Sequence, residues 1–171
     1  NGEFFLKDSI KMPDSLMYQT LKTKRTVYGG GGIMPDVFVP LDTAEITTYF
    51  SKLIQGGHVN SFAFNYINTN RAALKAQYPD IKSFKTNFTC DQAFMDAFFA
   101  YVSKEDPKLE FDAAAYATSE KLIQLRLKSV LAQDLWGTNE MFQVYNETNE
   151  ILQEAIQQIQ SKSYNNFNLE K

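Results

Sequence analysis

Between residues 42 and 162, apolar side chains recur at the three- and four-residue spacing of an α-helix, and residues that begin or end helices separate the runs. Side chains at this spacing fall on one face of a helix, so each run needs a neighbouring helix to cover it. The pattern therefore predicts a mainly α fold, an irregular bundle of about five helices with short connections.

Capping and terminating residues set the bounds of these helices. The segments 42–45 and 89–92 both have the form of a capping box, an acceptor side chain followed three residues later by Glu or Gln. The predicted helices begin at Asp42, near Phe62, at Thr89, near Asp112 and at Thr138, and they end at Gly56-Gly57, Tyr78-Pro79, Pro107, Gly137 and after Ile159. The last stripe, over 141–159, follows the helical spacing closely, and we interpret it as buried core.

The first 41 residues differ from the rest, because they contain three of the five prolines and most of the eight glycines. Within 24–40 the sequence predicts short strands at 24–28 and 35–40, separated by four glycines. Two short strands do not make a stable sheet, so this segment is expected to need a partner sheet that the rest of the sequence does not supply. The predicted organisation is an extended segment over 1–41, a helical domain over 42–162 and a frayed tail over 163–171.

Charge and hydropathy exclude several classes of function. The net charge is −3 with a pI of about 5.2, and lysines and arginines are scattered among acids. Binding to nucleic acid or to an anionic membrane surface needs a basic face, so neither is expected. The longest apolar stretches are only a few residues, which predicts no transmembrane segment. The chain begins with Asn rather than Met, which favours a piece of a longer protein, so the lack of a signal peptide says nothing about compartment.

The residues with reactive side chains do not form a recognisable catalytic, metal or cofactor motif. Cys90 is interpreted as a small residue in the first turn of a helix, and the alternative is a nucleophile paired with His58. His58 itself is interpreted as a surface or capping residue rather than a catalyst. The glycines at 29–32 lack the Lys and the following helix of a phosphate-binding loop, so they are interpreted as a close-packed crossing.

One segment, over 24–43, resembles a known family. Its sequence KRTVYGGGGIMPDVFVPLDT is similar to the segment that follows the catalytic core in S41 (C-terminal-processing, tail-specific) serine peptidases of the Bacteroidetes type. The helical remainder is similar to their C-terminal extension. The motif residues are Tyr28, Gly29, Gly30, Gly31, Gly32, Ile33, Pro35, Asp36, Val39 and Pro40.

The resemblance implies a secreted, periplasmic or envelope serine endopeptidase, with a PDZ domain and a Ser-Lys catalytic dyad upstream of this motif. No residue of this chain matches the nucleophilic Ser or the lysine of the dyad, so the chain itself is expected to be inactive. Its implied role is to brace or gate the protease core, with the upstream domains and, through them, protein substrates as partners. The segment 26–39 is a possible site of self-association. The alternative is a free-standing helical interaction module in the cell envelope.

Overall fold

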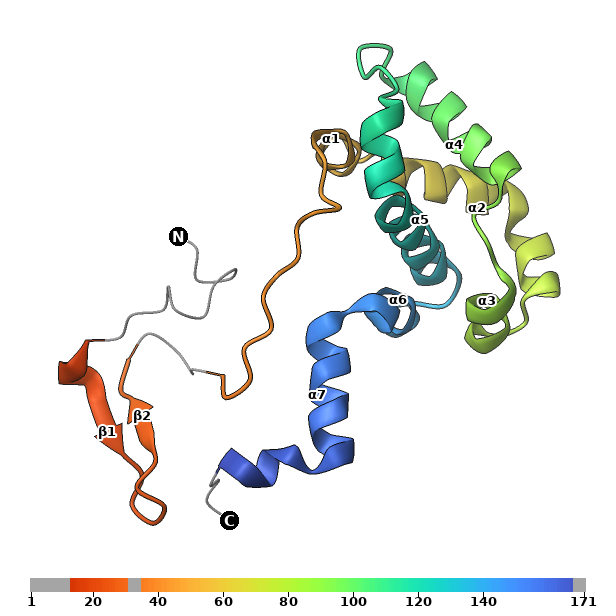
Figure 1. The fold of residues 1–171 in the computed structure, drawn as a ribbon. Coiled ribbons are helices and arrows are strands. Elements are labelled where there is room, and N and C mark those ends of the chain that lie inside the picture. The colour runs from red at the N-terminus through yellow and green to blue at the C-terminus, as the bar shows by residue number, and fades with distance from the viewer. Residues whose placement is uncertain (1–12, 31–34, 168–171) are drawn as a thin grey trace. The chain divides into compact units, whose positions relative to one another are not determined.

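The structure of the chain is a computed structural model that describes residues 13–30 and 35–167. The chain divides into two compact units: the helical unit, Thr43–Glu147, which holds the helices labelled α1 to α6 in Figure 1, and a second unit made of Asn1–Asp42 and Thr148–Lys171. Helices dominate, so the predicted mainly α fold is confirmed. Among the described residues no helix is both long enough and apolar enough to span a bilayer.

The helical unit is built around one long central helix. That helix, α5, packs against α1, α2 and α6, while α4 lies against α2 (Figure 1). The bounds of the six helices are α1 Thr48–Gln55, α2 His58–Gln77, α3 Ile81–Asn87, α4 Gln92–Glu105, α5 Ala113–Leu135 and α6 Thr138–Tyr145. Ile123, Leu127 and Leu131 on α5 are fully buried, so the predicted stripe on this helix faces the core.

Aromatic rings run through this core as one connected network. Phe62 on α2 packs edge-on against Phe94 and Phe98 of α4, with ring centroids 5.4 and 5.2 Å apart. Such edge-to-face contacts add to the stabilisation from burial alone. The other rings joined to the network are those of Tyr49, Tyr66, Tyr78, Phe84, Phe88, Phe99, Tyr101, Phe111, Tyr116 and Trp136.

Two helix starts differ from the sequence prediction. The first helix begins after Thr47 rather than Asp42, because the Thr47 hydroxyl accepts a hydrogen bond from the amide of Phe50 (3.2 Å) and also bonds the buried Ser119 hydroxyl (2.7 Å). The helix predicted from Thr89 is capped by Asp91, whose carboxylate accepts from the amide of Phe94 at 2.9 Å. The predicted start near Asp112 is confirmed.

The apolar stripes alone predict neither the exact start of α2 nor the existence of α3. Helix α2 starts at His58, one residue after Gly57, whose φ of 70° suits glycine. The short helix α3 was not predicted. Asp80 caps it by accepting from the amide of Ser83 at 2.7 Å, and its seven residues are too few to show a periodic stripe.

The single helix predicted from Thr138 is wrong, because the chain breaks after α6. A short 3-10 turn, Asn146–Thr148, follows it, and the Asn149 side chain then caps α7, Glu150–Ser161. Asparagine competes for backbone hydrogen bonds inside a helix and favours caps, which accounts for the break. The exposed fractions on α7 are 57 % for Ile151, 36 % for Leu152, 38 % for Ile156 and 67 % for Ile159, so their interpretation as core is also wrong.

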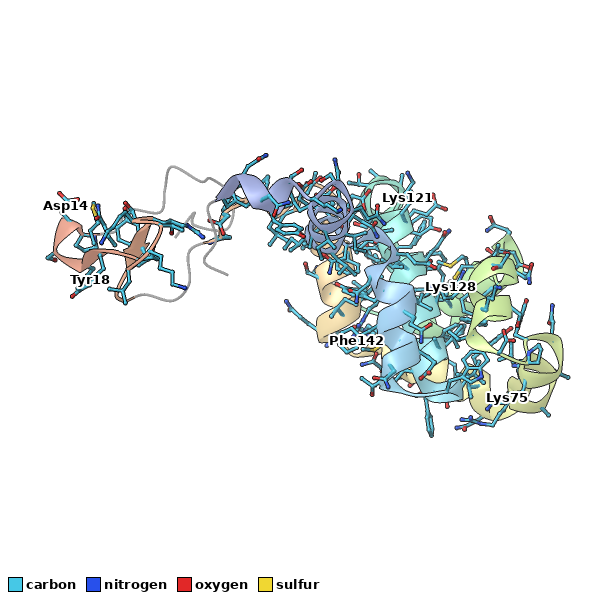
Figure 2. All side chains as sticks on the ribbon, turned by 90° about the horizontal axis from the view of Figure 1, so that it is seen from below. Asp14, Tyr18, Lys75, Lys121, Lys128 and Phe142 are labelled. Atoms are coloured by element: carbon cyan, nitrogen blue, oxygen red, sulfur yellow. The ribbon has the colours of Figure 1, made fainter. Side chains whose placement is uncertain are left out.

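The described part of 13–42 holds a small antiparallel hairpin. Strand β1, Met17–Gln19, pairs with β2, Thr26–Tyr28, in a register that puts Tyr18 opposite Val27. Figure 2 labels Tyr18 on this hairpin. The strand predicted at 24–28 is confirmed over 26–28. The strand predicted at 35–40 is wrong, since this stretch is irregular and its two prolines lack the amide hydrogens that a ladder needs. The partner strand comes instead from β1, so the sequence does supply one.

The C-terminal end of the described chain forms one more short turn. Residues Ser163–Phe167 make a 3-10 helix that lies against α7. The left-handed Lys162, with φ of 57°, ends α7 and turns the chain into it. The tail that the sequence predicts to be frayed thus includes this 3-10 helix, and its last four residues lie outside the described part.

Candidate functional site

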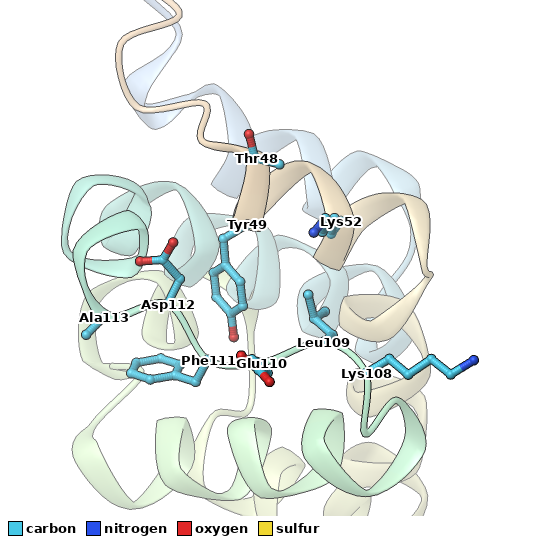
Figure 3. A pocket seen from close by; sticks show the side chains of 9 residues that line it. All are labelled: Thr48, Tyr49, Lys52, Lys108, Leu109, Glu110, Phe111, Asp112 and Ala113. Carbon is cyan, nitrogen blue, oxygen red and sulfur yellow. The ribbon is translucent and has the colours of Figure 1, made fainter.

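A surface pocket of about 500 Å³ lies in the helical unit, between α1 and the segment 108–113 that leads into α5 (Figure 3). Helix α1 contributes Thr48, Tyr49 and Lys52 to its lining. The remaining lining residues are Lys108, Leu109, Glu110, Phe111, Asp112 and Ala113. Apolar rings and charged groups of both signs therefore share one concave surface, as in many small-ligand sites.

Two aromatic rings, those of Tyr49 and Phe111, belong to the apolar part of the pocket, together with Leu109 and Ala113. Tyr49 is 5 % exposed and meets Phe111 edge-on, with centroids 5.9 Å apart. Phe111 is 53 % exposed, although its ring also contacts Phe99 at 4.8 Å and Tyr116 at 5.6 Å. An exposed ring held by three others presents a fixed apolar surface to solvent.

The Tyr49 hydroxyl is suited to donate a hydrogen bond rather than to act as a base. Burial raises its pKa above the usual value, and the nearby Asp112 carboxylate raises it further. The hydroxyl therefore keeps its proton throughout the neutral range.

Charged side chains of opposite sign line the pocket on different sides. Figure 3 shows the Asp112 carboxylate and the Lys52 side chain on opposite sides of the Tyr49 ring. One oxygen of Asp112 accepts from the amide of Ala115 at 2.9 Å, which caps α5 and fixes the carboxylate at the pocket edge. The same side chain thus has a structural role and a position suited to a cationic group.

Asp106 fixes the turn over 106–109, which leads into the segment that lines the pocket. Its Oδ1 accepts from the amide of Lys108 at 3.2 Å, and its Oδ2 lies 3.5 Å from Nε2 of His58. The carbonyl of Asp106 also accepts from the amide of Leu109 at 3.0 Å. His58 is only 8 % exposed, so it is not the surface residue that the sequence suggested, and it is not the helix cap either, because Gly57 occupies that position. It holds the turn that leads into the pocket.

Cys90 is placed for packing. Its Sγ lies 3.6 Å from the carbonyl oxygen of Gln124 on α5, and burial raises the pKa of the thiol to about 12. A thiol that stays protonated at neutral pH is a poor nucleophile. In the described ranges 13–30 and 35–167, no three His, Cys, Asp or Glu side chains come together in a way that could hold a metal ion.

The motif of 24–40 lies away from this pocket in sequence and belongs to the second unit. Tyr28 ends β2, and the amide of Gly29 donates to the carbonyl of Leu16 at 2.8 Å. A side chain at Gly29 would collide with the ring of Tyr18, which gives this glycine a packing role. Pro35, Asp36, Val39 and Pro40 lie in irregular chain, where Asp36 pairs with Arg25. Gly30 follows Gly29 in a bend, and Gly31, Gly32 and Ile33 lie outside the described residues.

Sequence reasoning missed the pocket. Its residues come from two segments about 60 positions apart, which only the packing of α1 against α5 brings together. One signal was present in the sequence: Phe111 stands among charged residues immediately before the Asp112 cap, where a buried residue is not expected.

The profile of a family of unknown function (DUF8443) matches residues 49–137, just over half of the chain. The chain therefore belongs to this family. The match covers α1 to α5 and all of the pocket except Thr48. No curated protein and no solved structure matches the chain.

Proposed function

We propose that this member of the DUF8443 family is a non-catalytic C-terminal region of an S41-type serine endopeptidase of the periplasm or cell envelope. Its role is to brace or gate the catalytic core, and its partners are the catalytic and PDZ domains of the same parent chain. Peptide hydrolysis belongs to the parent protein, and protein substrates reach this region only through it.

The observation that carries the proposal is that the motif belongs to a different compact unit from helices α1 to α6. The motif 24–40 lies in one compact unit and the helical bundle in the other. The hairpin of β1 and β2, whose second strand lies in the motif, has little core of its own. The exposed fractions are 45 % for Met17, 57 % for Tyr18 and 37 % for Val27. A two-stranded hairpin is marginal in water, which favours a larger partner surface in the parent.

The reading frame that encodes this chain tests the proposal directly. We expect it to encode, before Asn1, a serine nucleophile and a lysine in a Gly-Lys-Gly setting. In that parent protein, deletion of 43–171 is expected to lower thermal stability or peptidase activity. A frame without those residues would refute the proposal.

The isolated chain provides a second test. Residues 1–171 are expected to hydrolyse no casein, because no serine of the sequence stands in a catalytic motif. A fluorophosphonate probe that reacts with activated serines is expected to leave the chain unlabelled. Turnover of casein that such a probe abolishes would contradict the assignment of this region as non-catalytic.

Self-association through 26–39 is part of the proposal. Within the described residues β2 pairs with β1, and an unpaired strand edge can recruit another strand. We expect Val37→Lys to weaken any concentration-dependent association seen by light scattering. Leu21→Lys is the control, because Leu21 is 86 % exposed and lies outside 26–39. Equal effects of the two variants would remove this segment as the contact.

A free-standing helical interaction module in the envelope is the second candidate, and α7 favours it. Ile151, Leu152, Ile156 and Ile159 are all at least 36 % exposed on one 12-residue helix. An apolar stripe of this kind is typical of a helix that docks on another protein. This candidate predicts a short reading frame without a catalytic region, so the same sequencing experiment separates the two.

A further inference from the structure

We propose that the pocket between α1 and the segment 108–113 binds a small zwitterion with an apolar side chain, of the class of a free amino acid or a dipeptide. The inference is independent of the proposed place in a peptidase, because it rests only on residues of the helical unit. It assigns a ligand-binding role to a region that belongs to a family of unknown function.

The pocket is preformed, which is the first requirement for a small ligand. The segment 106–112 is fixed at both ends. At one end Asp106 accepts from the amide of Lys108 at 3.2 Å and lies 3.5 Å from His58. At the other end Asp112 accepts from the amide of Ala115 at 2.9 Å. Between them Phe111 is held against other rings, so a ligand meets a surface that needs little ordering.

The apolar part of the ligand is specified by Phe111. More than half of this side chain, 53 %, is open to solvent, although its neighbours fix the ring. Covering it with an aliphatic or aromatic group removes apolar surface from water, and an aromatic group can also stack on it. The volume of about 500 Å³ has room for one or two amino-acid residues.

The charged parts of the ligand are specified by the groups on either side of the rings. Lys52 and Lys108 can pair with a carboxylate, whereas Asp112 and Glu110 can pair with an ammonium group. Lys52 and Asp112 stand on opposite sides of Tyr49, so one ligand charge can approach each of them (Figure 3). A ligand with only one charge would pair with either Lys52 or Asp112 and leave the other without an opposite charge from the ligand.

Four probes with the same aromatic ring separate the contributions of the two ligand charges to binding. L-Phenylalanine carries both charges, phenylacetate only the anion, phenethylamine only the cation, and N-acetyl-L-phenylalaninamide neither. We expect amide chemical shifts of the full chain to move at 48–52 and 108–113 with L-phenylalanine, with a Kd in the millimolar range. Each single-charge probe should bind about tenfold more weakly. No shifts with L-phenylalanine, or equal binding of all four probes, would overturn the proposal.

Matched variants tie the binding to the pocket. Lys52→Gln and Asp112→Asn each remove one charge, and Asn retains the oxygen that caps α5. Each should weaken L-phenylalanine about tenfold, while Lys82→Gln on α3 should not. Phe111→Ala should weaken all four probes. Its control is Phe64→Ala, which removes a similarly exposed ring (59 %) on α2 outside the pocket. Binding that survives Lys52→Gln, Asp112→Asn and Phe111→Ala would place the site elsewhere and refute the assignment.

Discussion

The ammonium group of Lys128 on α5 donates a 2.9 Å hydrogen bond to the carbonyl oxygen of Phe88, at the end of α3. It donates a second, 2.8 Å long, to the carbonyl of Lys85 in the last turn of the same helix. The last carbonyl groups of a helix have no hydrogen-bond partner within it. Lys128 from the central helix provides the donor for two of these carbonyl groups. Burial lowers the pKa of Lys128, and the nearby Glu147 carboxylate offsets part of that shift.

Replacing this lysine should weaken the attachment of α3. Lys128→Met keeps a long apolar stem but removes the donors, and we expect it to lower the free energy of unfolding by about 1–3 kcal/mol. Urea denaturation of the full chain measures the change. Lys121→Met is the matched control, because Lys121 lies exposed on the same helix and should change stability by less than about 0.5 kcal/mol. Equal effects would show that the hydrogen bonds add nothing.

The partly buried Cys90 should be unreactive in the folded protein. Burial raises the pKa of its thiol to about 12, so little thiolate is present at neutral or mildly alkaline pH. We expect iodoacetamide to modify the Cys90 thiol far more slowly in buffer than in concentrated guanidinium chloride, which unfolds the chain and exposes the thiol. Mass spectrometry follows the modification. Equal rates in both conditions would mean that the thiol is open to solvent.

The same thiol predicts a loss of stability in alkali. The folded pKa of about 12 lies above the reference value of 9.0, so the folded state favours the protonated form. This contribution is fully present below pH 9.0 and is lost as the pH rises from there toward about 12. Cys90→Ala should show a shallower decrease in the free energy of unfolding over the first part of that range, before the tyrosines titrate. Identical slopes for the two proteins would contradict the shift.

Two isoleucines should differ sharply in their effect on stability. Ile123 on α5 is fully buried, so Ile123→Ala should lower the free energy of unfolding by about 2–5 kcal/mol. Ile159 on α7 is 67 % exposed, so Ile159→Ala should cost less than about 0.5 kcal/mol. Thermal and urea denaturation measure both. A large cost at Ile159 would show that a partner covers α7 in solution.

The helical unit should fold without the rest of the chain. Residues 43–147 contain α1 to α6 and the whole aromatic network, so their stripes bury one another. A protein of these residues should show a cooperative thermal transition when its helical signal is followed by far-ultraviolet circular dichroism. A gradual loss of signal would mean that the second unit contributes to this core.

The sequence predicts the positions of helices well where a strong terminator is present. Gly56-Gly57, Pro79, Pro107 and Gly137 all lie where helices end, because these residues act through their own backbone conformation. The sequence predicts helix starts less well, since several acceptor side chains stand near each start. At α1 the choice of Thr47 over Asp42 depends on Ser119, which lies more than 70 residues away and bonds both Thr47 and the carbonyl of Glu45.

The sequence by itself determined the mainly α character of the chain, because this character follows from the local spacing of apolar residues. The tertiary structure decided which stripes are buried. Val144 and Ile159 belong to the same helical pattern, yet Val144 is fully buried and Ile159 is 67 % exposed. Periodicity shows only that a helix has an apolar face, whereas burial requires a neighbour, and α6 has α5 beside it. The pocket likewise exists only because α1 and the segment 108–113 meet on α5.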